Sequence, residues 1–243
     1  MKKQELTYRP LGEGTLLIEW PSRIDEKILQ DILSLNRKIE DRLREKIDET
    51  QNTYHTLTIF FTPEIISYSE LINFIKEIQA EENEQLNDFR AAVWEIPVCY
   101  DIQFGIDLEV ISKAKNLSIE EIVKLHSETS YTVYFGGFLP GFLYLGGLSE
   151  KLFTPRKETP RASIRKGAVA IGGSQTGIYP QQSPGGWHII GNSPIVLFDV
   201  NENPPTRIKA GDKIKFIPIS KKEYDVLSER IRTDAFELKS HQI

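Results

Sequence analysis

The sequence has few of the residues that mark secreted, metal-binding or membrane proteins. It contains a single cysteine, Cys99, so no disulfide can form within the chain, and the apolar neighbours of Cys99 predict an inert core thiol rather than a nucleophile. Its four histidines show no H-E-x-x-H spacing, so we expect no metal site. No apolar run approaches the roughly 18 residues of a membrane span, and the first ten residues lack a signal-peptide core. We therefore expect a soluble, cytoplasmic protein without a bound metal.

Basic stretches and nucleotide-binding motifs are also absent. Lys and Arg number 30 against 35 Asp and Glu, and the formal net charge of −5 leaves no basic stripe for a phosphate backbone, so nucleic acid is not an expected partner. No G-x-x-x-x-G-K-[ST] loop occurs, so ATP, if it is used, is held in another way or by a partner. The run GGSQTG at 172–177 has threonine where a G-x-S-x-G elbow needs glycine, which argues against Ser174 as a nucleophile.

Glycine, proline and aromatic residues are concentrated between residues 134 and 198. Glycine permits positive φ and proline fixes φ, so this composition predicts tight turns rather than long regular elements. Between the turns lie short apolar pieces, at 168–171, 187–190 and 195–200, with the length and β-branched content of buried strands. The segment predicts a compact β-barrel whose loops hold aromatic side chains at a surface cleft.

The first hundred residues alternate between strand and helix patterns. The expected elements are a hairpin over 6–20, an amphipathic helix over 24–47, a strand over 53–61, a helix beginning at 68 and a strand over 91–98. This order, ββαβαβ, predicts an α+β domain of ferredoxin-like type over residues 1–100. His55 is alone inside a strand and is expected to be structural or exposed.

Capping and turn residues organise the remainder of the chain. Asp107 and Ser118 predict the starts of two helices, over 108–115 and 119–127. Turn signals at 203–205 and 210–212 precede an alternating strand that begins at Lys213 and would complete the barrel. We therefore expect an all-β barrel domain over residues 101–222, followed by a polar, helical tail over 223–243.

Several phrases of the chain resemble one known family. They are GFLPGFLYLGGL, TPRKETPR, GGSQTGIYPQQSPGGW, NPPTRIKAGDKIKF, EIPVCYD at 95–101 and EIVKLHSE at 121–128. They are similar to the carboxyltransferase-domain subunit 1 family, which includes the B subunit of prokaryotic 5-oxoprolinase, the Kip-type inhibitor of a sporulation histidine kinase, and proteins labelled allophanate hydrolase subunit 1. The resemblance covers nearly the whole chain. It implies a ferredoxin-like domain followed by a cyclophilin-like barrel.

The arginines and glycines of the 134–198 segment suit the binding of a small, anionic molecule. Arg156 and Arg161 flank prolines in TPRKETPR, and the planar fork of arginine matches a carboxylate or phosphate in a bidentate way, so both are candidate catalytic groups. The candidate substrate-binding groups are Gly172, Gly173, Gln175, Thr176, Tyr179, Gly185 and Gly186, which offer backbone and side-chain donors and acceptors. The competing interpretation is that the glycines only make barrel corners and the arginines lie on the surface.

Two histidines are further candidates. His126 at the end of the second predicted helix is either a cation favoured at a helix C-terminus or a catalytic group facing the cleft. The family pattern has a histidine in a matching E-x-x-x-L-H-S phrase, which supports the second interpretation. His188 lies on the strand face opposite Trp187. The resembled sequences usually carry glutamine there, so a hydrogen-bonding role is expected at 188 rather than an obligatory proton shuttle.

The resemblance implies two functions of different classes. The first is the B subunit of an ATP-dependent 5-oxoprolinase, which opens 5-oxo-L-proline to L-glutamate only in complex with the A and C subunits, with ATP held together with a partner. The second is an inhibitor that docks on a histidine kinase, with Phe138, Phe142 and Tyr144 as exposed anchors for a partner helix. An allophanate or urea-linked amidase partner is disfavoured because the chain has no amidase Ser-Lys pattern.

Overall fold

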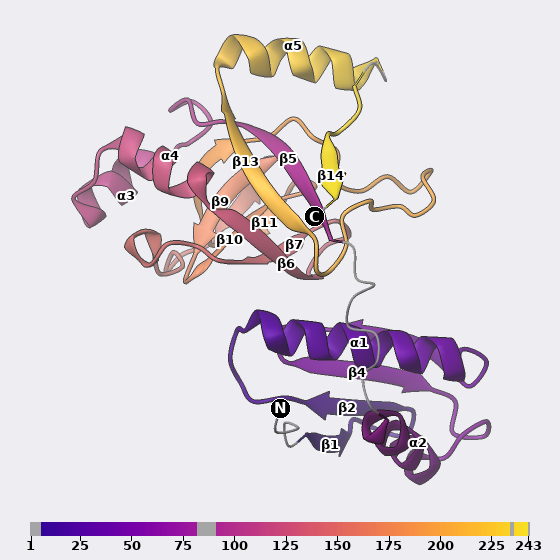
Figure 1. Ribbon diagram of the computed structural model, residues 1–243. Coiled ribbons are helices and arrows are strands. Elements are labelled where there is room, and N and C mark those ends of the chain that lie inside the picture. The colour runs from indigo at the N-terminus through magenta and orange to yellow at the C-terminus, as the bar shows by residue number, and fades with distance from the viewer. Residues whose placement is uncertain (1–5, 82–90, 234–235, 243) are drawn as a thin grey trace. The chain divides into compact units, whose positions relative to one another are not determined.

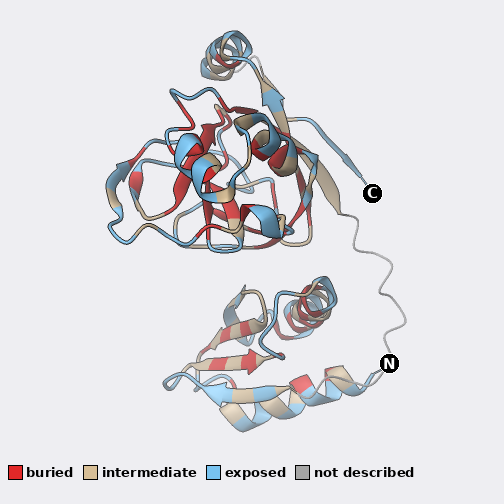
Figure 2. Cartoon of the chain, turned by 90° about the vertical axis from the view of Figure 1, so that its left-hand side faces the viewer, coloured by how far each residue is buried: buried red, intermediate tan, exposed pale blue. Residues whose placement is uncertain are grey.

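The computed structural model of the chain describes residues 6–81, 91–233 and 236–242 (Figure 1). The chain forms two compact units, residues 1–90 and residues 91–243, which we call the N-terminal unit and the barrel unit. Each unit has a hydrophobic core of its own. Figure 2 shows the buried residues on the inner faces of the helices and strands of each unit.

The N-terminal unit packs helices α1 and α2 against an antiparallel sheet. Its elements are β1 Thr7–Pro10, β2 Thr15–Glu19, α1 Glu26–Leu43, β3 Ile47–Asn52, β4 Thr56–Phe61 and α2 Tyr68–Ala80. The strand order is β1-β2-β4-β3, and each neighbouring pair is antiparallel. The hairpin predicted over 6–20 is therefore confirmed as the β1–β2 pair.

Polar side chains cap both helices of this unit. The Asp25 side chain caps α1 by accepting a hydrogen bond from the backbone N of Lys27 at 2.8 Å, and Ser67 and Glu70 form a capping box at the start of α2. The apolar stripe of α1 is buried at Ile28, Leu29, Ile32, Leu35, Ile39 and Leu43. Burying a side chain of this size stabilises a fold by roughly 1.5–3 kcal/mol, so the stripe fixes which face of α1 meets the sheet.

The order ββαβαβ predicted for this half is wrong in two places. Residues 47–52 form a separate strand, β3, ahead of β4. The strand expected to close the domain, now β5 (Ala92–Cys99), belongs to the barrel unit. Alternating apolar and polar residues in a sequence predict a strand, but they do not predict which sheet the strand joins. Within the described residues, β1 takes the sheet edge beside β2, and the ferredoxin-like arrangement is not confirmed.

The barrel unit begins with β5 and continues through helices and short strands. Its further elements are α3 Leu108–Lys115, α4 Ile119–Glu128, β6 Ser130–Gly136, β7 Leu143–Gly146, the 3-10 helix η2 Glu150–Leu152, β8 Arg161–Ile164, β9 Ala168–Gly172, β10 Gln175–Ile178, β11 Ser183–Gly185, β12 His188–Asn192, β13 Lys213–Ile219, α5 Lys221–Arg232 and β14 Ser240–Gln242. The helix cap predicted at Ser118 is present at the start of α4, as part of a capping box with Glu121.

Seven of these strands close into a barrel, as the sequence predicts for this part of the chain. Their order is β12-β9-β10-β7-β6-β13-β5, and β12 pairs with β5 to close the ring. The pair of β13 with β5 is parallel, and the other neighbouring pairs are antiparallel. Strands β8 and β11 form a separate two-stranded ribbon. Closure removes the exposed edges that short strands would otherwise present.

The boundary between the two units lies at a different position in the sequence from the one predicted. The division falls after residue 90 rather than residue 100, because β5 pairs with β13 from Val93 to Cys99. Residues 223–243 are also more than a polar tail. Ser220 starts helix α5 with a capping box, and β14 pairs with β5 between Ser240 and Trp94.

Asp212 ties the start of β5 to the turn before β13. Its carboxylate is buried and accepts hydrogen bonds from the Ala92 backbone N at 3.0 Å, from Trp94 Nε1 at 2.9 Å and from the Lys209 backbone N at 3.0 Å. Hydrogen bonds to a carboxylate are stronger than those between neutral groups, so these contacts hold the start of β5 to the turn. The predicted turn at 210–212 therefore also sets the register of the parallel pair.

Candidate functional site

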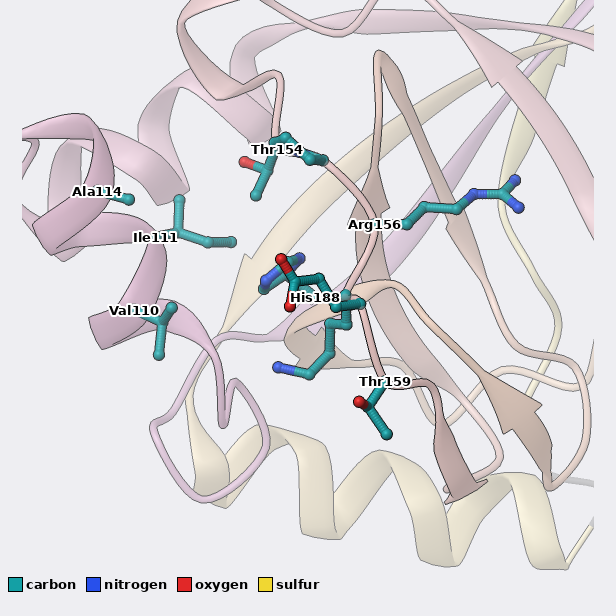
Figure 3. A pocket seen from close by; sticks show the side chains of 10 residues that line it. Val110, Ile111, Ala114, Thr154, Arg156, Thr159 and His188 are labelled. Atoms are coloured by element: carbon teal, nitrogen blue, oxygen red, sulfur yellow. The ribbon is translucent and has the colours of Figure 1, made fainter.

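A pocket of about 460 Å³ opens on the surface of the barrel unit (Figure 3). One wall is apolar and comes from α3, with Val110, Ile111 and Ala114. The other wall is polar and comes from residues 154–159 together with His188 at the start of β12. A cavity of this volume is in the range that holds small molecules, and a mixed lining of this kind fixes their orientation.

The polar wall is held at two points, Thr154 and Lys157, by backbone hydrogen bonds. Thr154 and Gly173 exchange two such bonds, at 3.0 and 2.6 Å, and the backbone N of Lys157 donates to the carbonyl of Gly186 at 2.7 Å. Gly173 has φ +65°, a conformation that side chains rarely adopt. Two of the predicted glycines thus support the wall through their backbones, and no ligand is needed to explain them.

Asp107 lies beneath this wall at the start of α3, and its carboxylate is buried. Arg161 donates two hydrogen bonds to the carboxylate, at 2.9 and 2.7 Å, and the Ile189 backbone N donates a third at 2.7 Å. Burial by itself raises the pKa of Asp107, but the hydrogen bonds from Arg161 and Ile189 outweigh it, and the pKa is lowered from its usual value. The carboxylate therefore stays charged at neutral pH.

These contacts correct two predictions. Asp107 occupies the N-cap position of α3, but its side chain makes no capping hydrogen bond because it is turned to Arg161. The fork of Arg161 binds a carboxylate in the bidentate way predicted, yet that carboxylate belongs to the chain itself. Asp107 was missed as a site residue because its partner lies 54 residues away in the sequence.

Lys157 adds a second positive charge to the same group. Its Nζ lies 3.7 Å from Oδ1 of Asp107, and its side chain is 26% exposed. Arg161 already balances the charge of Asp107, so Lys157 leaves the group with one excess positive charge. Arg156 and Glu158, which also line the pocket, carry opposite charges.

His188 is the predicted site residue that lines the pocket and is itself buried. Its Nδ1 is buried without a hydrogen-bond partner. Burial lowers the pKa of His188, and the charges of Lys157 and Arg161 lower it further, while that of Asp107 opposes them. The imidazole is therefore neutral near pH 7, which agrees with a hydrogen-bonding role.

Arg156 lines the pocket with its stem, while its charged head lies elsewhere. Its Cζ lies 5.8 Å from the centre of the Trp187 ring, and in Figure 3 the side chain extends away from Val110, Ile111 and Ala114. Trp187 in turn packs against Gly172, where a Cβ would lie 2.3 Å from the indole Cδ1.

His126 lies in the barrel core and not in the pocket. Its side chain has no exposed area and stacks on Phe216, with ring centres 4.6 Å apart. Nδ1 lies 2.7 Å from the Tyr100 hydroxyl, and Nε2 lies 2.8 Å from Oγ1 of Thr176. The Thr176 hydroxyl donates its proton to the carbonyl of Ala170, so Nε2 must donate to Thr176 and Nδ1 must accept from Tyr100. Burial lowers the pKa of His126 to about 3.

The remaining predicted residues lie outside the pocket lining. Tyr179 packs against Gly185, where a Cβ would lie 2.4 Å from the tyrosine hydroxyl oxygen. Gln175 pairs with Gly172 in the β9–β10 ladder. Of the aromatic anchors predicted for a partner, Phe138 is 62% exposed, but Phe142 is buried against Tyr179 and Trp187.

The described residues show neither a metal-binding cluster nor a membrane-spanning helix. There, no group of three or more His, Cys, Asp or Glu side chains is placed to hold a metal ion. In the same residues, each helix is too short or too polar to span a bilayer. Cys99 is a free, buried thiol whose pKa is raised by burial, as the sequence predicts for an inert core cysteine.

The sequence matches a known family over most of its length. Residues 6–208 match the model of the carboxyltransferase domain, subdomain C and D. The chain belongs to this family. The B subunit of 5-oxoprolinase from Bacillus subtilis (strain 168) is 39% identical over 229 residues, which cover 90% of this chain and 95% of the relative. The resemblance seen in the sequence is therefore confirmed.

Solved structures share the fold of this chain. The structure of TTHA0988 aligns with a TM-score of 0.74 at 29% identity and covers 88% of this chain, which corresponds to 40% of that chain. The Kluyveromyces lactis urea carboxylase aligns over 99% of this chain with a TM-score of 0.81, at 18% identity and over 24% of its own length, and so shows a shared fold. None of the relatives named here is described as a kinase inhibitor, so that alternative gains no support over the oxoprolinase one.

Proposed function

We propose that this chain is the B subunit of an ATP-dependent 5-oxoprolinase, which acts with the A and C subunits to open 5-oxo-L-proline to L-glutamate. The observation that carries the proposal is the 39% identity to the B subunit of a 5-oxoprolinase over 95% of that protein's length. A match over nearly the whole of both chains involves both units, so it supports a protein of the same kind. A cytoplasmic location is part of the proposal.

The chemistry of lactam opening explains why partners are needed. A five-membered lactam is a stable amide, and its carbonyl must be strongly polarised or phosphorylated before it opens. The pocket supplies the ammonium group of Lys157 and a neutral imidazole. The sequence has no P-loop, and the described residues hold no metal-binding cluster. ATP and the groups that activate it are therefore assigned to the complex, with the A and C subunits completing the site.

Within this proposal the predicted site residues take different roles. His188 and Arg156 line the substrate pocket, and Arg161 acts through Asp107. Gly173 and Gly186 hold the polar wall. His126, Thr176, Tyr179 and the other predicted residues support the barrel around it.

Reconstitution with the partner subunits tests the proposal. The purified chain alone is expected to show no oxoproline-dependent ATP hydrolysis, and the complex with the A and C subunits is expected to show it. ATP hydrolysis that stays independent of 5-oxoproline in the full complex would contradict the proposal. In cells, loss of the gene should cause 5-oxoproline to accumulate and abolish growth on it as nitrogen source. Normal oxoproline use with altered kinase autophosphorylation would instead favour the inhibitor.

A further inference from the structure

We infer that the pocket beside α3 is a subsite for the carboxylate of a small cyclic amide. Lys157 binds the anion, His188 hydrogen-bonds the amide, and Asp107 positions both. The inference rests on the proposed function for the identity of the ligand, while the chemistry of the subsite follows from the residues that line the pocket and lie beneath it.

The charge balance around Asp107 leaves Lys157 available for an anion. Both carboxylate oxygens of Asp107 are engaged at 2.7–2.9 Å by Arg161 and by the Ile189 backbone N. Lys157 Nζ, at 3.7 Å, is beyond hydrogen-bonding distance. Its ammonium group has three donors and is only partly exposed, so it attracts an anion more strongly than a fully solvated lysine would.

The imidazole of His188 is an unsatisfied polar group in the pocket wall. The residue is 9% exposed, and Nδ1 has no hydrogen-bond partner. A buried polar group left in this state destabilises a fold, so its retention is best explained by a ligand that engages the ring. Because the imidazole is neutral, one nitrogen donates and the other accepts, which suits the N–H and C=O of an amide.

Asp107 contacts both Lys157 and the backbone next to His188. Its Oδ1 faces Lys157, and its Oδ2 accepts from the backbone N of Ile189, the residue after His188. Its own backbone N donates to the Ile189 carbonyl at 2.9 Å. The start of α3, the start of β12 and the polar wall are thereby fixed to one carboxylate. Asp107 is a positioning residue and does not line the pocket.

The opposite wall selects the rest of the ligand. Val110, Ile111 and Ala114 present hydrocarbon surface from α3, and Val110 is 52% exposed. A ligand with one carboxylate, one amide and a short hydrocarbon edge matches the cation, the imidazole and this wall at once. The class is a small cyclic amide carboxylate, of which 5-oxo-L-proline is an example. Glu158 also lines the pocket and opposes the anion.

Calorimetric titration of the full chain with three probes tests the subsite. The probes are 5-oxo-L-proline, cyclopentanecarboxylate, which lacks the amide, and 2-pyrrolidinone, which lacks the carboxylate. We expect Lys157→Met to weaken binding of both carboxylates by about tenfold and to leave 2-pyrrolidinone unchanged. His188→Phe should weaken the binding of 5-oxo-L-proline and leave the binding of cyclopentanecarboxylate unchanged. Glu158→Gln should strengthen the binding of both carboxylates. Lys222→Met, an exposed lysine on α5, is the matched control and should change nothing.

The positioning role of Asp107 needs a readout beyond affinity. The charge of Asp107 raises the pKa of His188. In Asp107→Asn the His188 imidazole should therefore titrate at lower pH when followed by NMR, with weaker binding of both carboxylates. An unchanged His188 titration would remove Asp107 from the site.

The outcomes separate this subsite from the proposed function. Equal affinity of the wild-type chain and Lys157→Met for the carboxylates, or no binding of any probe, overturns the subsite. Oxoproline-dependent ATP hydrolysis in the complex with an unchanged KM in Lys157→Met would overturn the subsite and leave the function standing. If carboxylates bind in a Lys157-dependent way but the complex shows no oxoproline-dependent ATP hydrolysis, the subsite stands as one for another carboxylate. The proposed oxoprolinase function is then overturned.

Discussion

The two buried histidines of the barrel unit occupy opposite kinds of surroundings. His126 has a partner for each ring nitrogen and aromatic rings on its faces. His188 lines the pocket with a buried Nδ1 that has no partner. Burial lowers the pKa of both, so both are neutral. The chain completes the hydrogen bonds of His126 and leaves Nδ1 of His188 without a partner.

This difference indicates which histidine is structural and which is functional. A polar network that is fully satisfied inside the protein stabilises the fold and has nothing left to offer a ligand. A polar group that is kept buried and unsatisfied weakens the fold unless something else binds it. The contrast therefore points to the wall at 188 as the reactive surface, although both histidines were candidates in the sequence.

The largest expected effect on stability comes from removing His126, the histidine whose hydrogen bonds are all made within the chain. His126→Ala opens a cavity against Phe216 and leaves the buried hydroxyl of Tyr100 without its partner. We expect the free energy of unfolding to fall by about 3–5 kcal/mol. The matched change His188→Ala should cost about 1 kcal/mol or less. Urea denaturation followed by circular dichroism measures both, and equal losses would contradict the contrast.

A smaller effect is expected where the pocket wall depends on a buried charge pair. Arg161→Ala leaves the buried carboxylate of Asp107 with Lys157 as its remaining cation, at 3.7 Å. Breaking a buried pair costs about 3–5 kcal/mol, and because the Arg161 side chain is 26% exposed we expect about 2–3 kcal/mol here. The double change Asp107→Asn with Arg161→Met should recover part of the loss in the same urea assay. No recovery would show that the loss comes from packing rather than charge.

The smallest effect within the range that can be measured cleanly, about pH 6.5 to 5, is the pH dependence of stability. The folded pKa of His126 is about 3, below the usual value of about 6.5, so the unfolded chain binds the proton first as pH falls. Stability is complete above about pH 6.5 and declines towards pH 3, by up to about 1.4 kcal/mol per pH unit for this residue. Tyr100 and Tyr131, which face His126, have raised pKa values and do not titrate there.

His126→Gln isolates this dependence because the amide keeps hydrogen-bonding groups in the core. Between about pH 6.5 and 5, where the carboxyl groups stay ionised, its unfolding free energy should vary less with pH than that of the wild type. His188 retains a weaker dependence of the same sign. Parallel curves for the two proteins would mean that His126 is not the group that titrates.

Several local elements were predicted because their signals are local, although residues 195–200, predicted as a strand, form none. The helix predicted over 108–115 is α3, and the strand predicted over 168–171 is β9 with one more residue. The assignment of β5 failed because pairing partners lie far away in the sequence: Trp94 and Asp212 are 118 residues apart. Periodicity identifies an element, but the sheet it joins depends on tertiary packing.

The candidate site was predicted in part for the same reason. TPRKETPR was recognised as a polar segment, and residues 154–159 of it line the pocket together with His188. The sequence suggested two free arginine forks, whereas one is bound by Asp107 and the other lies over Trp187. Which cation remains unbalanced depends on distances, and a linear pattern contains none. Lys157, between the two prolines, carried no signal that set it apart from other lysines.

The position of β5 in the ring also constrains how the protein is made. This strand is the first of the barrel to be synthesised, yet its parallel partner is β13, and the strand that pairs with it from the other side is β12. During translation all the described strands of the N-terminal unit are made before β13 is synthesised. The barrel cannot close until residue 219 has been added. Strand β5 therefore stays without its parallel partner while most of the remaining chain is synthesised.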